Sequence, residues 1–68
     1  MNRYKVNYYR FVYGSKEVAL YEGFVVARRW QIDKVDDVLA FYDEDHDIIA
    51  VYKWSLVVSF NVMEKDSG

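Results

Sequence analysis

The chain has no cysteine and no proline, and it has only three glycines among 68 residues. Without cysteine, disulfide bonds and thiolate metal sites are excluded, and a cytoplasmic setting is the expected one. Three glycines are too few for a Gly-rich phosphate loop, so no cofactor is predicted. No stretch approaches the roughly 20 apolar residues of a membrane span, and no signal peptide is apparent at the start.

The length allows one domain, which we place at residues 1–63, followed by a polar tail at residues 64–68. A domain of this size buries only about 60% of its unfolded surface. Since neither disulfides nor thiolate metal sites are available, a second subunit is the expected way to complete the core, and we predict a homo-oligomer such as a homodimer. The composition, 53% hydrophobic and 19% aromatic, argues against disorder.

Charge is divided unevenly along the chain, although the net charge is only −2. Residues 1–31 carry six basic and two acidic side chains, a balance of +4. Residues 32–68 carry three basic and nine acidic side chains, a balance of −6. The division predicts one basic and one acidic surface, or two copies that meet head to tail.

The last third of the chain, Asp47 to Met63, is predicted to form two strands of a hairpin around which the fold is organised. In its second strand, Leu56, Val58, Phe60 and Val62 alternate with more polar positions. That period of two is typical of a strand with one buried face. A strand with so little charge needs a cover, because an open edge of this kind invites aggregation.

Residues 3–13 are predicted to form the first strand. Its alternation changes phase at Tyr8-Tyr9, which predicts a bulge or bend there. A turn at Gly14-Ser15 would pair Phe11 with Val18 and Tyr9 with Leu20. The second strand then continues to Gly23, which is either a turn or a kink in one long strand.

Residues 33–42 have two interpretations. Val35, Val38, Leu39 and Tyr42 have helical spacing, and Asp33 occupies an N-cap position. Against this, the aromatic and β-branched residues favour a strand, which we prefer. The predicted fold is therefore all-β: an antiparallel meander of five to six strands, either curled into an SH3-like barrel or completed as a sheet by dimerisation. The alternative is an α+β fold with one short helix near residues 33–42.

The acidic loop is the most conspicuous polar cluster, and it contains Asp43, Glu44, Asp45 and Asp47. Its alternate aspartates resemble the start of a calcium loop, but Ile48 and Trp54 stand where the glycine and glutamate of that loop belong. We therefore predict no metal site, and a hairpin tip whose aspartates cap turn amides. His46, the single histidine, is interpreted as a turn residue. No nucleophile is paired with a base in the sequence, and an enzyme is not expected.

Arg28, Arg29, Trp30 and Trp54 complete the candidate binding residues, because Trp and Arg dominate protein-binding hot spots. The two tryptophans could equally be core. We predict a non-enzymatic module that binds a protein partner with the acidic loop and this aromatic and arginine patch, by analogy a regulator or phage-type inhibitor. One alternative is a single-stranded nucleic-acid binder that uses Arg28, Arg29 and Trp30. Another is a structural subunit of a homo-oligomer.

Overall fold

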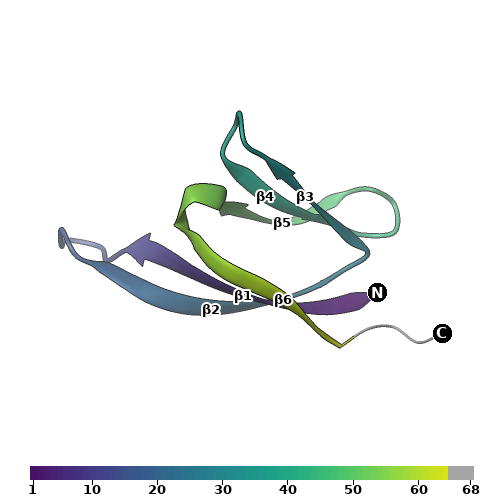
Figure 1. Ribbon diagram of the computed structural model, residues 1–68, viewed down its shortest axis with the longest axis horizontal. Coiled ribbons are helices and arrows are strands. Elements are labelled where there is room, and N and C mark those ends of the chain that lie inside the picture. Colours follow the sequence, from purple (N-terminus) through teal and green to yellow (C-terminus); the bar gives the residue numbers. More distant parts are fainter. Residues whose placement is uncertain (65–68) are drawn as a thin grey trace.

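The computed structural model describes residues 1–64 and contains six antiparallel strands in two three-stranded sheets (Figure 1). Sheet one has the strand order β2-β1-β6, and sheet two has the order β3-β4-β5. The elements are β1 (Asn2–Phe11), β2 (Val18–Ala27), β3 (Arg29–Asp33), β4 (Val38–Tyr42), β5 (Ile48–Lys53), the 3-10 helix η1 (Trp54–Leu56) and β6 (Val57–Glu64). The all-β prediction is confirmed. The strands do not close into a barrel, and the helix predicted as the alternative near residues 33–42 does not form.

The predicted hairpin over residues 47–63 is wrong. β5 and β6 lie in different sheets, because η1 turns the chain away and β6 then pairs with β1. The pairing also skips one residue of β6, since Asn7 lies opposite Ser59 and Tyr8 lies opposite Val57. Val58 is the extra residue, and it is exposed instead of sharing a buried face with Phe60. The bulge at Val58 changes the phase of β6, so the predicted alternation of one buried and one exposed face does not continue along the whole strand.

The first hairpin has the predicted register, with Phe11 opposite Val18 and Tyr9 opposite Leu20. Its turn is closed by the Ser15 amide, which donates to the Val12 carbonyl over 3.1 Å, and Gly14 supplies the positive φ of 75°. β1 itself pairs with β2 without interruption. The irregularity predicted near Tyr8-Tyr9 therefore lies in the β1–β6 pairing, where β6 carries the extra residue.

The core lies between the two sheets and is made of apolar and aromatic side chains. Its buried members are Tyr4, Val6, Val25 and Ala27 of sheet one and Leu39 and Phe41 of sheet two. The Phe41 ring lies 5.2 Å from the Tyr4 ring and 6.2 Å from the Phe60 ring. No polar or charged side chain of the described residues is buried. Aromatic rings of the two sheets thus pack against each other across the core.

Gly23 lies within β2, so the interpretation as one long strand is correct. A Cβ atom at this position would lie 2.7 Å from the Tyr52 hydroxyl and 3.3 Å from Tyr8 Cε1. The Tyr8 and Tyr52 rings lie 5.0 Å apart. Glycine at this position therefore leaves room for the close approach of Tyr52 of sheet two to the backbone of sheet one.

Aspartate side chains fix the connections at one end of sheet two. Asp33 Oδ1 accepts the amides of Val35 and Asp36 over 3.0 and 3.1 Å. This is the capping geometry that suggested a helix, but the chain turns instead of continuing as a helix. Asp37, which has a φ of 57°, accepts both the amide and the hydroxyl of Ser55, over 2.8 and 2.6 Å. Asp37 thereby joins the β3–β4 turn to η1.

The molecule is elongated, measuring 45 × 25 × 17 Å. Figure 1 shows the β1–β2 hairpin extending past the rest of the fold. β6 pairs with β1 only as far as Tyr8, so the hairpin beyond that point (residues 9–20, the arm) is a two-stranded ribbon. Phe11 at 65% exposure and Leu20 at 58% are among its solvent-exposed apolar residues.

Candidate functional site

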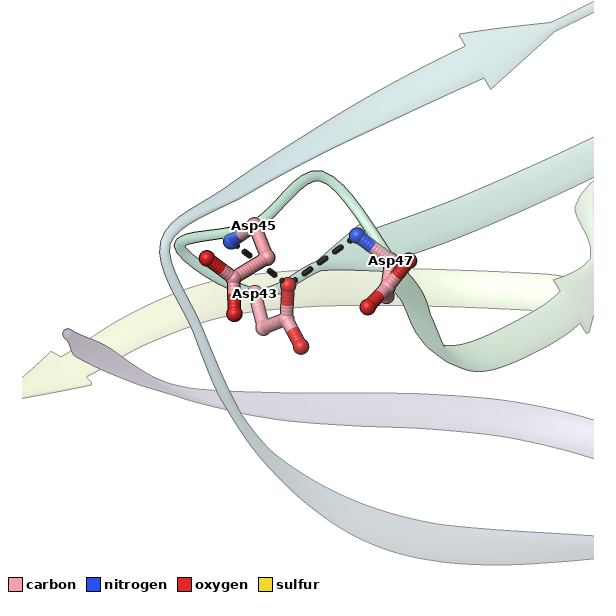
Figure 2. Close-up of side chains that lie close together, drawn as sticks. All are labelled: Asp43, Asp45 and Asp47. Atoms are coloured by element: carbon pink, nitrogen blue, oxygen red, sulfur yellow. Dashed lines mark hydrogen bonds between the residues drawn. The ribbon is translucent and has the colours of Figure 1, made fainter.

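The acidic loop is a hairpin tip held by its own first residue (Figure 2). Asp43 Oδ1 accepts the amides of Asp45 and Asp47 over 2.8 and 3.0 Å. The Asp43 amide in turn donates to the Asp47 carbonyl, and the His46 amide donates to the Asp43 carbonyl. His46 has a φ of 66° and lies within the turn, as interpreted from the sequence. The predicted capping role of the aspartates is confirmed for Asp43.

Three carboxylates of the loop lie close together, since oxygens of Asp43, Asp45 and Asp47 fall within 4.8 Å of one another. One of the Asp43 oxygens already serves two amides, and the other two side chains are exposed. Exposed acidic clusters are common at turns, and nothing else at this tip points to a cation. Asp45, Asp47 and the exposed Glu44 instead present negative charge to solvent.

Strand pairing brings Arg28 and Arg29 beside the acidic loop. The Arg28 amide donates to the carbonyl of Tyr42 over 2.8 Å, and Arg29 lies opposite Tyr42 in the β3–β4 pairing. The Arg29 guanidinium carbon lies 4.6 Å from the centre of the Tyr42 ring. Since Asp43 follows Tyr42 directly, the two arginines and the loop share one end of sheet two. We call this the charged end, comprising Arg28, Arg29 and residues 43–47.

The two tryptophans are divided between core and surface. Trp30 on β3 is 44% exposed, and its ring packs edge-on against Phe60 at 4.9 Å. Trp54 on η1 is half-buried, with its ring 6.2 Å from Phe60 and its amide bonded to the Asp37 carbonyl. Asp37 precedes β4 and Asp43 follows it, so Trp54 lies at the opposite end of sheet two from the acidic loop. The structure therefore does not bring Trp54 to the charged end.

Among the described residues, at least two shallow hollows lie outside the predicted site. One of about 270 Å³ is lined by Tyr8, Tyr9, Arg10, Val51, Tyr52, Lys53 and Leu56. Burial, followed by the nearby Tyr8, raises the pKa of Tyr52 above its ordinary value of 10.0. The other, of about 180 Å³, lies on the outer face of sheet two. Sequence reasoning missed the first hollow because its lining comes from β1, β5 and η1, whose proximity depends on the crossover between sheets.

The serines have structural hydrogen bonds within the described part of the chain. Ser15 Oγ accepts the Glu17 amide, Ser55 Oγ donates to Asp37, and Ser59 Oγ accepts from the Asn7 side chain. None of these three hydrogen bonds within residues 1–64 joins a serine to His46, the single histidine. The same residues contain no helix long and apolar enough to cross a membrane.

Comparison with known proteins finds no matching family, no similar curated protein and no similar solved structure.

Proposed function

We propose that the chain is a non-enzymatic protein-binding module that docks its charged end, together with the half-exposed Trp30, on a partner protein. The observation that supports this most directly is the pairing of Arg29 with Tyr42, because it places two arginines next to the acidic loop. Opposite charges side by side at one end of sheet two give a surface that discriminates by charge pattern.

The contacts within this surface support a recognition role. Asp43 fixes the loop, and the Tyr42 ring holds the Arg29 side chain. A surface that is ordered before binding loses less conformational entropy when a partner arrives. Trp30 adds an aromatic side chain of the kind enriched in binding hot spots, with one edge anchored on Phe60.

The local charge favours a basic protein partner over nucleic acid. The charged end carries Arg28 and Arg29 against four carboxylates, Asp43, Glu44, Asp45 and Asp47. Phosphate groups would meet net repulsion there, and phosphate contacts dominate nucleic-acid affinity. A module of this kind would act as a regulator or inhibitor by occupying a basic site on its partner.

The test is a comparison of charge variants in capture from a lysate of the native host, with bound proteins identified by mass spectrometry. The loop variant is E44Q/D45N/D47N, which removes charge but spares the structural Asp43. The control is D36N, which removes an exposed charge at the opposite end of sheet two. We expect one protein to be captured by the wild type and D36N and lost with the loop variant.

Two results would contradict the proposal. Capture that survives in the loop variant at 50 mM salt would remove the acidic loop from the binding surface. Binding of a labelled single-stranded oligonucleotide that weakens steeply with salt and is lost with R28Q would favour the nucleic-acid alternative instead.

A further inference from the structure

Within residues 1–64 the fold has four edge strands, and three of them carry features that oppose pairing with another strand. β6 contains two extra residues, Val58 and Met63, relative to its partner β1. β5 contains the extra residue Ile49, and β3 has only five residues, which include Arg29 and Asp33. Bulges, shortness and charge are the usual means by which proteins protect sheet edges.

β2 lacks this protection. It is ten residues long, it pairs with β1 without a bulge, and the described residues place no strand on its other side. Its single charged side chain, Glu22, is paired with Lys5 at 2.9 Å. A long, apolar and regular edge of this kind is a template for another strand.

The hydrogen-bond pattern of the hairpin shows which groups of β2 face outward. The Val12 amide donates to the Glu17 carbonyl, so the even-numbered residues of β1 form the hydrogen-bonded pairs with β2. The amides and carbonyls of the residues between those pairs point away from β1. On β2 these outward-facing residues are Val18, Leu20, Glu22, Phe24 and Val26.

We propose that β2 pairs antiparallel with β2 of a second copy, so that the two copies share one six-stranded sheet with its two-fold axis at Gly23. In this register Leu20 of one copy lies opposite Val26 of the other, and Glu22 lies opposite Phe24. A register centred on Glu22 would instead set two glutamates opposite each other, which is unfavourable. The two-fold arrangement is closed, so no β2 edge remains for a third copy.

We assign a second copy of the chain as the partner of β2, because two β2 edges of the same apolar character would then face each other. Its outward face is apolar at four of five positions, and its one charge is already paired, so the edge has nothing with which to select a charged partner. The pairing would supply about eight backbone hydrogen bonds. The contact would be about 34 Å long and about 10 Å thick, or roughly 340 Å² per copy, which is less than half of the area that a standard interface buries per partner and is the size of a weak, transient contact. We therefore expect a dimer that dissociates in the micromolar range.

Sedimentation of the full chain from 5 to 500 µM tests the dimer. The wild type should shift reversibly from the 8.2 kDa monomer to twice that mass. Leu20→Pro removes an outward amide of β2 and should leave the chain monomeric throughout. The matched control is Phe11→Pro, which removes an amide of the same pair type on the other side of the arm, and it should dimerise as the wild type does.

Cysteine cross-linking tests the register and does not depend on the proline variants folding. The chain has no cysteine of its own, so L20C/V26C should form disulfide-linked dimers on mild oxidation, while L20C and V26C alone should not. A wild type that stays monomeric at 500 µM, or assembles without limit, would overturn the proposal. So would cross-linking of L20C/F24C in place of L20C/V26C, or loss of dimerisation with Phe11→Pro but not with Leu20→Pro.

Discussion

Sheet two and sheet one each have three strands, but they differ in strand length, in how their turns are held and in burial. Sheet two has strands of five and six residues, and aspartate side chains hold both of its turns. Its central strand β4 is the best buried strand of the described chain, with Leu39, Ala40 and Phe41 all enclosed. Sheet one has strands of eight and ten residues, and it extends past the core into the arm.

The difference shows which sheet supplies buried and hydrogen-bonded structure and which supplies most of the exposed apolar surface. Three aspartates, Asp33, Asp37 and Asp43, each accept two hydrogen bonds from groups in turns or in η1. Three of the nine acidic side chains of residues 32–68 therefore stabilise local chain geometry. More of the exposed apolar residues lie on sheet one, where Phe11, Leu20 and Phe24 are each more than half exposed, although Ile48 and Val51 of sheet two are exposed to a similar extent.

The strongest test of this difference between the sheets is to replace Phe41, where the largest loss of stability is expected. Its side chain is fully buried and its ring contacts aromatic rings of both sheets. Phe41→Ala should lower the free energy of unfolding by about 3–5 kcal/mol, enough to unfold much of so small a domain. Urea unfolding followed by tryptophan fluorescence measures this. The control Phe11→Ala, on the arm, should change the unfolding free energy by no more than about 0.5 kcal/mol. Equal losses at the two positions would show that the sheets do not differ as described.

A smaller effect is expected where the sheets touch at Gly23. Gly23→Ala places a methyl group 2.7 Å from the Tyr52 hydroxyl and should cost about 1–2 kcal/mol of unfolding free energy. In the Tyr52→Phe background, where that oxygen is absent, the same substitution should cost less, because the closest remaining contact is Tyr8 Cε1 at 3.3 Å. The double-mutant cycle, measured by urea unfolding, should therefore give a coupling of about 1 kcal/mol. Additive effects would mean that Tyr52 does not press on β2.

The strands of the first hairpin and of β4 were predictable because their signals are local. The register of Phe11 with Val18 followed from one turn and simple alternation. At residues 33–42 the aspartate at position 33 caps amides in a turn as it would in a helix, so the cap alone could not distinguish the two. The high β propensity of residues 38–42 correctly favoured a strand over a helix.

The partner of β6 was not predictable, because strand pairing between distant segments leaves no trace in a single alternation pattern. Val58 is an extra residue whose presence shifts the phase of the whole strand, and the sequence does not mark it. The candidate site was predictable in part. Arg28 and Arg29 lie at the same end of sheet two as the acidic loop, through a pairing with Tyr42 that the sequence did not reveal, whereas Trp54 lies at the other end.

The smallest expected effect concerns pH and again depends on the contact between sheets at Tyr52. Burial, and then the nearby Tyr8, raise the pKa of Tyr52 in the folded protein above the unfolded value of 10.0. The unfolded chain therefore loses this proton first as the pH rises. The stability contribution is complete below pH 10 and is lost as the pH increases through the folded pKa.

Urea unfolding at intervals from pH 9 to 11.5 should thus show a steeper loss of unfolding free energy for the wild type than for Tyr52→Phe. The other tyrosines are present in both proteins, so the difference between the two curves isolates Tyr52. Parallel curves would mean that sheet two does not bury this hydroxyl against sheet one.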